Sequence, residues 1–118
     1  MDLNTFLENV KSKQAINFDD TMAIINAHYQ YTPTSFTNGL GESGVINKAG
    51  TNEGSCKIFA FAQLNQLDQD QTLSLFGDFY HQDVLQDPSG TSHQNIRNFM
   101  QSSWGGIKFN ATNTLVPK

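Results

Sequence analysis

The sequence predicts an α+β fold: a mostly helical single domain of about five helices, with a small antiparallel sheet of two or three short strands. Apolar residues recur at helical spacing in five segments, and short runs of β-forming residues flank turns rich in glycine and proline. With 118 residues the chain is long enough for one hydrophobic core, and nine phenylalanines supply much of its apolar area. We assign residues 1–110 to this domain and expect residues 111–118 to form a flexible C-terminal tail.

Each of the five predicted helices has a start signal or an apolar stripe. The first spans about residues 3–13, and the second begins near Asn17 with two aspartates in its first turn. The third, about residues 56–67, is apolar on nearly every face, so it should be buried at the centre of the domain. Asp68 caps the fourth helix, whose apolar stripe continues to position 84, and Ser92 caps the fifth.

Three short segments are predicted to be strands. Residues 31–37 are rich in β-formers, and Pro33 favours an edge position because proline donates no hydrogen bond to a neighbouring strand. Turn residues then lead to residues 45–47, which are predicted to return beside the first strand as a hairpin. Residues 107–109 alternate in the manner of a third strand.

Neutral amides supply most of the polar surface. The chain has twelve Asn and ten Gln against eleven Asp and Glu, and its formal net charge is −4. Its seven Lys and Arg are scattered, whereas a nucleic-acid-binding surface or an anchor for an anionic membrane needs clustered basic residues. We therefore expect neither nucleic acid nor a membrane as a partner.

The sequence also favours a cytoplasmic location. The N-terminus lacks the basic start and apolar run of a secretory signal, and no apolar stretch approaches the roughly 20 residues of a membrane-spanning helix. The single cysteine excludes an intrachain disulfide and suggests a reducing compartment.

Cys56 is the first candidate for chemistry. It follows a glycine-rich loop at the start of the apolar third helix, with Ser55 as the expected N-cap. A thiol in the first helical turn tends toward a lowered pKa, because unpaired N–H groups and the helix dipole favour negative charge there. The alternative is that Cys56 packs in the core as a small apolar residue. Gly50 and Gly54 are expected to let the loop turn sharply through positive φ angles.

His93 is the best candidate for a base that would activate Cys56, because neighbouring amides could orient its ring. The Gly-Ser-Cys tripeptide is similar to the nucleophile segment of papain-like proteases, although Lys57 stands where that family has an aromatic residue. The alternative for His93 is a capping or surface role. The metal-binding patterns C-x-x-C and H-E-x-x-H, calcium loops and phosphate-binding loops are all missing, so we expect no metal and no cofactor.

Several polar and aromatic residues are candidates for ligand binding. Tyrosine and tryptophan combine apolar bodies with polar tips and are enriched in binding sites, although they also border hydrophobic cores. Around Cys56 we expect a pocket formed by the loop before it and by the segment that follows His93. The binding candidates are Tyr31, Asn52, Asn95, Arg97 and Trp104.

Five segments together resemble a known family. They are YTPTSF (31–36), NEGSCKIFAFA (52–62), FG (76–77), HQNIRNFM (93–100) and WGGI (104–107). From about Phe18 to Phe109 the chain resembles the HopJ type III effector family. The resemblance implies a bacterial protein associated with type III secretion, and it carries over no catalytic residues.

Two functions follow as expectations. The first is a HopJ-type effector-like protein of unestablished biochemical activity that acts through contact with an unidentified protein or small molecule. It would be cytoplasmic where it is made and would be secreted by a type III system if the family name applies. The alternative is a cysteine-dependent hydrolase or acyltransferase with Cys56 as nucleophile and His93 as base.

Overall fold

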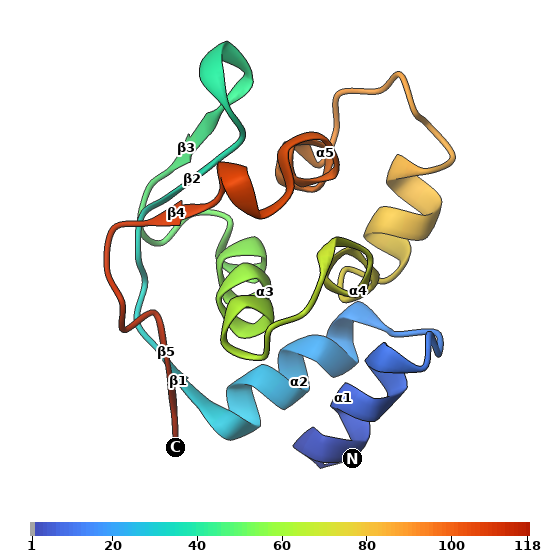
Figure 1. Cartoon of the computed structure of the whole chain (residues 1–118), viewed down its shortest axis with the longest axis vertical. Helices are drawn as coiled ribbons and strands as arrows, with labels where there is room; N and C mark the ends of the chain where they lie inside the picture. Colours follow the sequence, from blue (N-terminus) through green and yellow to red (C-terminus); the bar gives the residue numbers. More distant parts are fainter. Residues whose placement is uncertain (1) are drawn as a thin grey trace.

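The computed structural model describes residues 2–118 as an α+β domain with two small antiparallel sheets (Figure 1). Its helices are α1 (Leu3–Lys11), α2 (Phe18–His28), α3 (Glu53–Leu64), α4 (Gln69–Ser74), the π-helix η2 (Phe79–Val84) and α5 (Gln94–Ser102), with the 3-10 turns η1 (Gly41–Ser43) and η3 (Ser103–Gly106). Its strands are β1 (Tyr29–Tyr31), β2 (Phe36–Asn38), β3 (Val45–Asn47), β4 (Lys108–Phe109) and β5 (Leu115–Pro117). The predicted fold class is confirmed.

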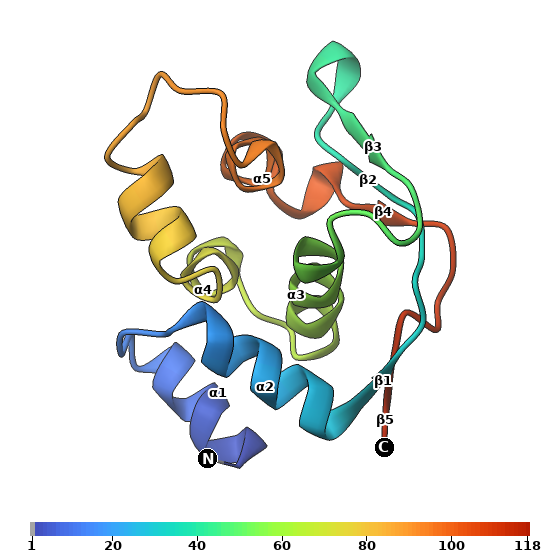
Figure 2. The same cartoon turned by 180° about the vertical axis from the view of Figure 1, so that it is seen from behind.

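The helix α3 lies at the centre of the domain, as predicted. The other helices and the strands surround it in views from opposite sides (Figures 1 and 2). Ile58, Phe59 and Phe61 are fully buried on different faces of α3. The Phe59 ring alone is in contact with the rings of Phe36, Phe76, Phe99 and Trp104. Elements that are far apart in the sequence therefore share one core through α3.

Two predicted helix starts are confirmed by their side-chain caps. The Asn17 Oδ1 atom accepts a hydrogen bond from the Asp19 N–H at 2.7 Å. Asp68 and Gln71 form a complete capping box at the start of α4. In both caps the first residue is extended and its side chain turns back to satisfy a backbone N–H of the first turn.

The predicted fourth helix is interrupted in the structure. The helix α4 ends at Ser74, and the segment after it re-forms as the π-helix η2, in which the Leu85 N–H donates to the Tyr80 carbonyl at 2.9 Å. Gly77, with φ of +60°, lies in the interruption. A Cβ atom at Gly77 would lie 2.8 Å from the backbone nitrogen of Phe18. The break thus lets the chain pass close to the start of α2.

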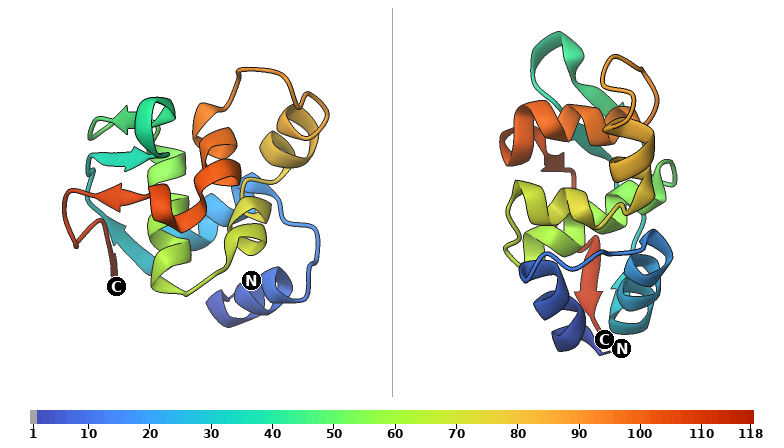
Figure 3. Two further views of the ribbon diagram at one scale, coloured as in Figure 1. Left: turned by 45° about the horizontal axis from the view of Figure 1, so that its top comes forward. Right: turned by 90° about the vertical axis from the view of Figure 1, so that its right-hand side faces the viewer.

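The expected strand over residues 31–37 is two strands in the structure. The strand β1 ends before Pro33 and β2 starts after it, and the two belong to different sheets. In the three-stranded sheet, Phe36 of β2 is opposite Asn47 of β3 and Phe109 of β4, so the predicted hairpin and third strand are present. Figure 3 shows these strands at one side of α3.

The C-terminal segment differs from the expected flexible tail. Residues 115–117 form β5, which pairs antiparallel with β1, and Leu115 is opposite Tyr31. Leu115 is buried in the core. Its apolar side chain and the unpaired edge of β1 account for the ordering, because both are covered when β5 docks. Among the helices of residues 2–118, none has the length and apolar character needed to cross a membrane.

Candidate functional site

The N-terminal ends of α3 and α5 meet at one pocket, which we call the α3–α5 pocket. Its volume is about 260 Å³. Its polar lining comes from the first turns of the two helices: Asn52, Gly54, Ser55, His93, Gln94 and Asn95. In Figure 1, α5 lies on the side of the domain toward which the N-terminal end of α3 points.

The remaining wall of the α3–α5 pocket is apolar and mainly aromatic. It is formed by Phe18, Phe76, Phe79 and Ile96. The Phe79 ring packs edge-on against Phe18 with 4.9 Å between ring centroids, and it also lies 5.3 Å from the His93 ring. Phe79 keeps 39% of its surface exposed, which is unusual for so large an apolar residue. An apolar wall combined with a few convergent polar groups is typical of small-molecule sites.

The two helix starts at the pocket lack side-chain caps. Asn52 and His93 are the N-cap residues, and both adopt left-handed conformations, with φ of +49° and +52°. Neither side chain caps its helix. In α3 the first backbone N–H with a helical acceptor is that of Cys56, which donates to the Asn52 carbonyl, and in α5 it is that of Ile96, which donates to the His93 carbonyl. The N–H groups before these positions have no helical acceptor, so they and the helix dipoles favour an electron-rich group in the pocket.

His93 is held in place by the π-helix. Its Nε2 atom lies 3.1 Å from the Asp83 Oδ2 atom. Within residues 2–118 this is the one contact between a basic and an acidic side chain that is short enough for an ion pair. Asp83 belongs to η2, so the contact ties η2 to the start of α5. A carboxylate partner fixes the orientation of an imidazole ring.

Five asparagines form an amide cluster beneath the pocket: Asn38, Asn47, Asn52, Asn95 and Asn98. The Asn95 Oδ1 atom accepts from the Nδ2 atoms of Asn38 and Asn47, each at 3.0 Å. The Asn47 Oδ1 atom accepts from Asn95 at 2.9 Å and from Asn52 at 2.7 Å. Asn98 donates to the Asn38 and Ser43 carbonyls. The amide cluster thereby fastens the β2–β3 hairpin and the loop before α3 to the start of α5.

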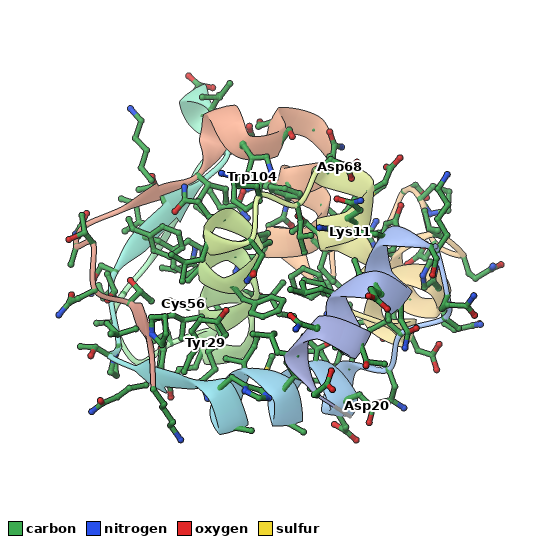
Figure 4. The ribbon with its side chains drawn as sticks, turned by 60° about the horizontal axis from the view of Figure 1, so that its bottom comes forward. Lys11, Asp20, Tyr29, Cys56, Asp68 and Trp104 are labelled. Atoms are coloured by element: carbon green, nitrogen blue, oxygen red, sulfur yellow. The ribbon has the colours of Figure 1, made fainter. Side chains whose placement is uncertain are left out.

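The structure corrects the expectation for Ser55 and Cys56. The N-cap of α3 is Asn52, so Cys56 is in the fourth helical position and its own N–H is already bonded to the Asn52 carbonyl. The Cys56 side chain is 1% exposed, and its thiol donates to the Thr34 carbonyl at 3.5 Å (Figure 4). Burial raises the pKa of the thiol and outweighs Tyr31 and Thr34, which lower it. Cys56 therefore packs as a core residue.

Gly54 also differs from its expected role. Gly50 has the predicted positive φ, of +86°, whereas Gly54 lies inside the first turn of α3 and has no positive φ. A Cβ atom at Gly54 would come within 3.1 Å of the Phe18 ring. The absence of a side chain there serves close packing against the aromatic wall.

The pairing of Cys56 with His93 is not supported. The Cys56 thiol bonds to Thr34 and does not line the α3–α5 pocket, whereas His93 lines the pocket and contacts Asp83. The expected cap at Ser92 is also wrong, because His93 itself is the N-cap of α5. Within residues 2–118, no three His, Cys, Asp or Glu side chains are grouped in a way that could hold a metal ion.

The structure brings only part of the predicted binding set together. Asn52 and Asn95 line the α3–α5 pocket beside His93. Arg97 is nearly buried, and its guanidinium donates to the carbonyls of Ser92 and Asp87, so it holds the loop before α5.

Tyr31 and Trp104 lie elsewhere. Burial is the main cause that raises the pKa of the Tyr31 hydroxyl, and the neighbouring Cys56 and Glu53 raise it further. The Lys57 ammonium lies 4.9 Å from the centre of the Tyr31 ring. The Trp104 indole donates to the Leu67 carbonyl at 3.1 Å and packs on the core.

The sequence reasoning missed the aromatic wall and Asp83. Phe18 and Phe76 belong to the apolar stripes of the predicted helices, and the break at Gly77, after which Phe79 is partly exposed, has no distinct sequence pattern. The high asparagine content was the available signal for the amide cluster. It does not reveal which asparagines meet, because they come from three separate segments.

Asn95→Ala should lower the free energy of unfolding by about 2–4 kcal/mol, because it removes three buried side-chain hydrogen bonds that join Asn95 to Asn38 and Asn47. Urea denaturation followed by circular dichroism measures the change. Asn113→Ala, at an exposed position, is the control and should stay within about 0.5 kcal/mol of the original chain. A loss below about 1 kcal/mol for Asn95→Ala would show that the amide cluster does not stabilise the fold.

Native Cys56 should react with iodoacetamide only as fast as the chain unfolds, since its thiol is buried with a raised pKa. The raised pKa also has a consequence for stability. The folded state retains the proton longer than the unfolded state, so stability is fully present below the unfolded thiol pKa, about 8.5, and falls as pH rises above it. Cys56→Ala should flatten this decline in urea titrations above that pH. Rapid labelling of native protein at neutral pH would contradict this account.

Comparisons with known proteins agree with this architecture. A solved structure titled "Crystal structure of unknown function protein VPA0580" is similar, with 48% sequence identity and a TM-score of 0.93, over 100% of this chain and 95% of that one. None of the curated proteins matches the chain. A sequence profile described as HopJ type III effector protein matches residues 3–114, which include α1 to α5, the π-helix and four of the strands. The chain belongs to the HopJ type III effector protein family.

Proposed function

We propose that the protein acts by binding a small molecule in the α3–α5 pocket. The ligand has a planar apolar body and an anionic end, and no catalytic step is assigned to it. The observation that carries this proposal is the meeting of two uncapped helix starts with an aromatic wall in one cavity.

The aromatic wall supports a flat ring as the body of the ligand. Phe18, Phe76 and Phe79 line one part of the pocket, and Phe79 is partly exposed, so a ligand that covers it would bury apolar surface. The volume of about 260 Å³ is near the lower end of small-molecule sites. It suits one or two fused rings.

The polar side of the pocket supports an anionic end. Gly54, Ser55, Gln94 and Asn95 line the same cavity and their backbone N–H groups have no acceptor in the helices, and helix N-termini favour negative charge by about 0.3–1 kcal/mol each. His93 adds an imidazole that Asp83 holds in position. The amide cluster keeps the two helix starts at a fixed separation, so binding requires little reordering of the site.

The test compares 1-naphthoate with 1-naphthamide, a neutral ligand of almost the same shape, by NMR titration of the labelled full chain. We expect 1-naphthoate to shift the amide signals of Gly54, Ser55, Gln94 and Asn95. We also expect it to bind at least about fivefold more tightly than the amide, which matches the stabilisation of a charge by two helix ends.

Two serine variants make this test specific. Ser55→Leu places a larger side chain in the pocket and should abolish binding, whereas Ser89→Leu, in an exposed turn outside the pocket, should leave the affinity unchanged. Equal affinity for the two ligands, or shifts that map elsewhere and survive Ser55→Leu, would refute the proposal.

We infer a location from family membership. The protein is bacterial, is made in the cytoplasm and is exported by a type III secretion system; the matched family description supports this. An adenylate-cyclase reporter fused to the C-terminal end should give a signal in host cells only when the bacteria have a working secretion apparatus. An equal signal from a secretion-deficient strain, or none from either strain, would contradict export by this route.

A further inference from the structure

A second and larger cavity lies between the C-terminal end of α1, the helix α4 and the start of η2. We call it the α1–α4 groove. Its volume is about 680 Å³, and it shares no lining residue with the α3–α5 pocket. Figure 4 labels Lys11 and Asp68, which line it from α1 and from the residue before α4. The floor includes the buried side chain of Val10.

Opposite charges line the α1–α4 groove, and the two signs come from different elements. Lys11 and Lys13 come from the end of α1 and the turn after it, whereas Asp70 and Asp78 come from α4 and the residue before η2. None of these four side chains forms an ion pair within residues 2–118. Asp68 is different, because its carboxylate caps α4.

The lysines and the aspartates of the groove do not pair with one another, since no lysine nitrogen lies within 4 Å of an aspartate oxygen in the described part of the chain. Each of the four side chains is therefore left without a charged partner where it lines the groove. Tyr80 also lines the groove, where burial and then the charge of Asp70 raise the pKa of its hydroxyl. The hydroxyl therefore remains a protonated hydrogen-bond donor.

We propose that the α1–α4 groove binds a dipolar small molecule, with a primary ammonium group against Asp70 and Asp78 and a carboxylate against Lys11 and Lys13. A ligand with a single charge would pair with only two of these four side chains. Because these side chains are exposed and water screens each contact, a single contact gives little affinity and both ends are needed together. The site is independent of the function proposed for the α3–α5 pocket.

The test uses NMR titrations of the labelled full chain with α,ω-amino acids, which differ in the distance between their ammonium and carboxylate groups. The amino acids are glycine, 3-aminopropionate, 4-aminobutyrate and 6-aminohexanoate. Butylamine, which carries only the ammonium group, and butyrate, which carries only the carboxylate, are the singly charged controls. We expect one chain length to bind best, at least about tenfold more tightly than either singly charged compound. Its signal shifts should map to Lys11, Lys13, Asp70 and Asp78. Affinity should fall when salt is raised.

Charge variants complete the test. Lys13→Gln and Asp78→Asn should each lower the affinity for the best-binding amino acid at least about fivefold, toward the affinity of a singly charged compound. Lys108→Gln and Asp20→Asn remove exposed charges outside the groove and should leave the affinity unchanged. Preserved amide spectra show that each variant is folded. The proposal is overturned if none of the amino acids binds saturably, or if their affinity does not depend on chain length. It is also overturned if the control variants weaken binding as much as the groove variants.

Discussion

The fold depends on the need to bury α3 on all sides. Its fully buried residues Ile58, Phe59 and Phe61 point in different directions, so a single partner element could not cover them. Several elements cover α3 together: α2, α4, α5 and the strands each contact α3 or its neighbours and form a shell around it (Figure 1). The short strands follow from this arrangement. Each has two or three residues, and their main role is to close the side of α3 that the helices leave open.

The shell closes around the sides of α3 but not over its N-terminal end. There the neighbouring elements are the β2–β3 hairpin and the start of α5, and they are joined by polar contacts instead of apolar ones. The hydrogen bonds of the amide cluster fix one arrangement of the segments that it joins, although the buried Asn38 Oδ1 atom has no partner in the described part of the chain. The amide cluster thus stabilises the fold and also sets the spacing of the two helix starts at the α3–α5 pocket.

The elements that could be predicted from the sequence are those determined locally. The all-round apolar pattern of α3, the caps at Asn17 and Asp68, and the return of residues 45–47 as a strand all depend on neighbours within a few positions. The features that were missed depend on distant contacts. The predicted fourth helix is broken at Gly77, where the backbone of Phe18 lies too close for a side chain, and β5 pairs with the edge of β1. Of the site residues, Asn52, His93 and Asn95 were identified, whereas the aromatic wall requires that same break.

The contrast between two kinds of helix start explains why the pocket has open donors. At α2 and α4 the N-cap residue is extended and its side chain bonds to the first turn. At α3 and α5 the N-cap residue is left-handed, a conformation that asparagine and histidine adopt more often than most residues with a side chain. That conformation accompanies another use of the side chain: Asn52 bonds to Asn47, and His93 contacts Asp83. One choice of backbone conformation therefore leaves the first-turn N–H groups uncapped and also anchors the loops around them.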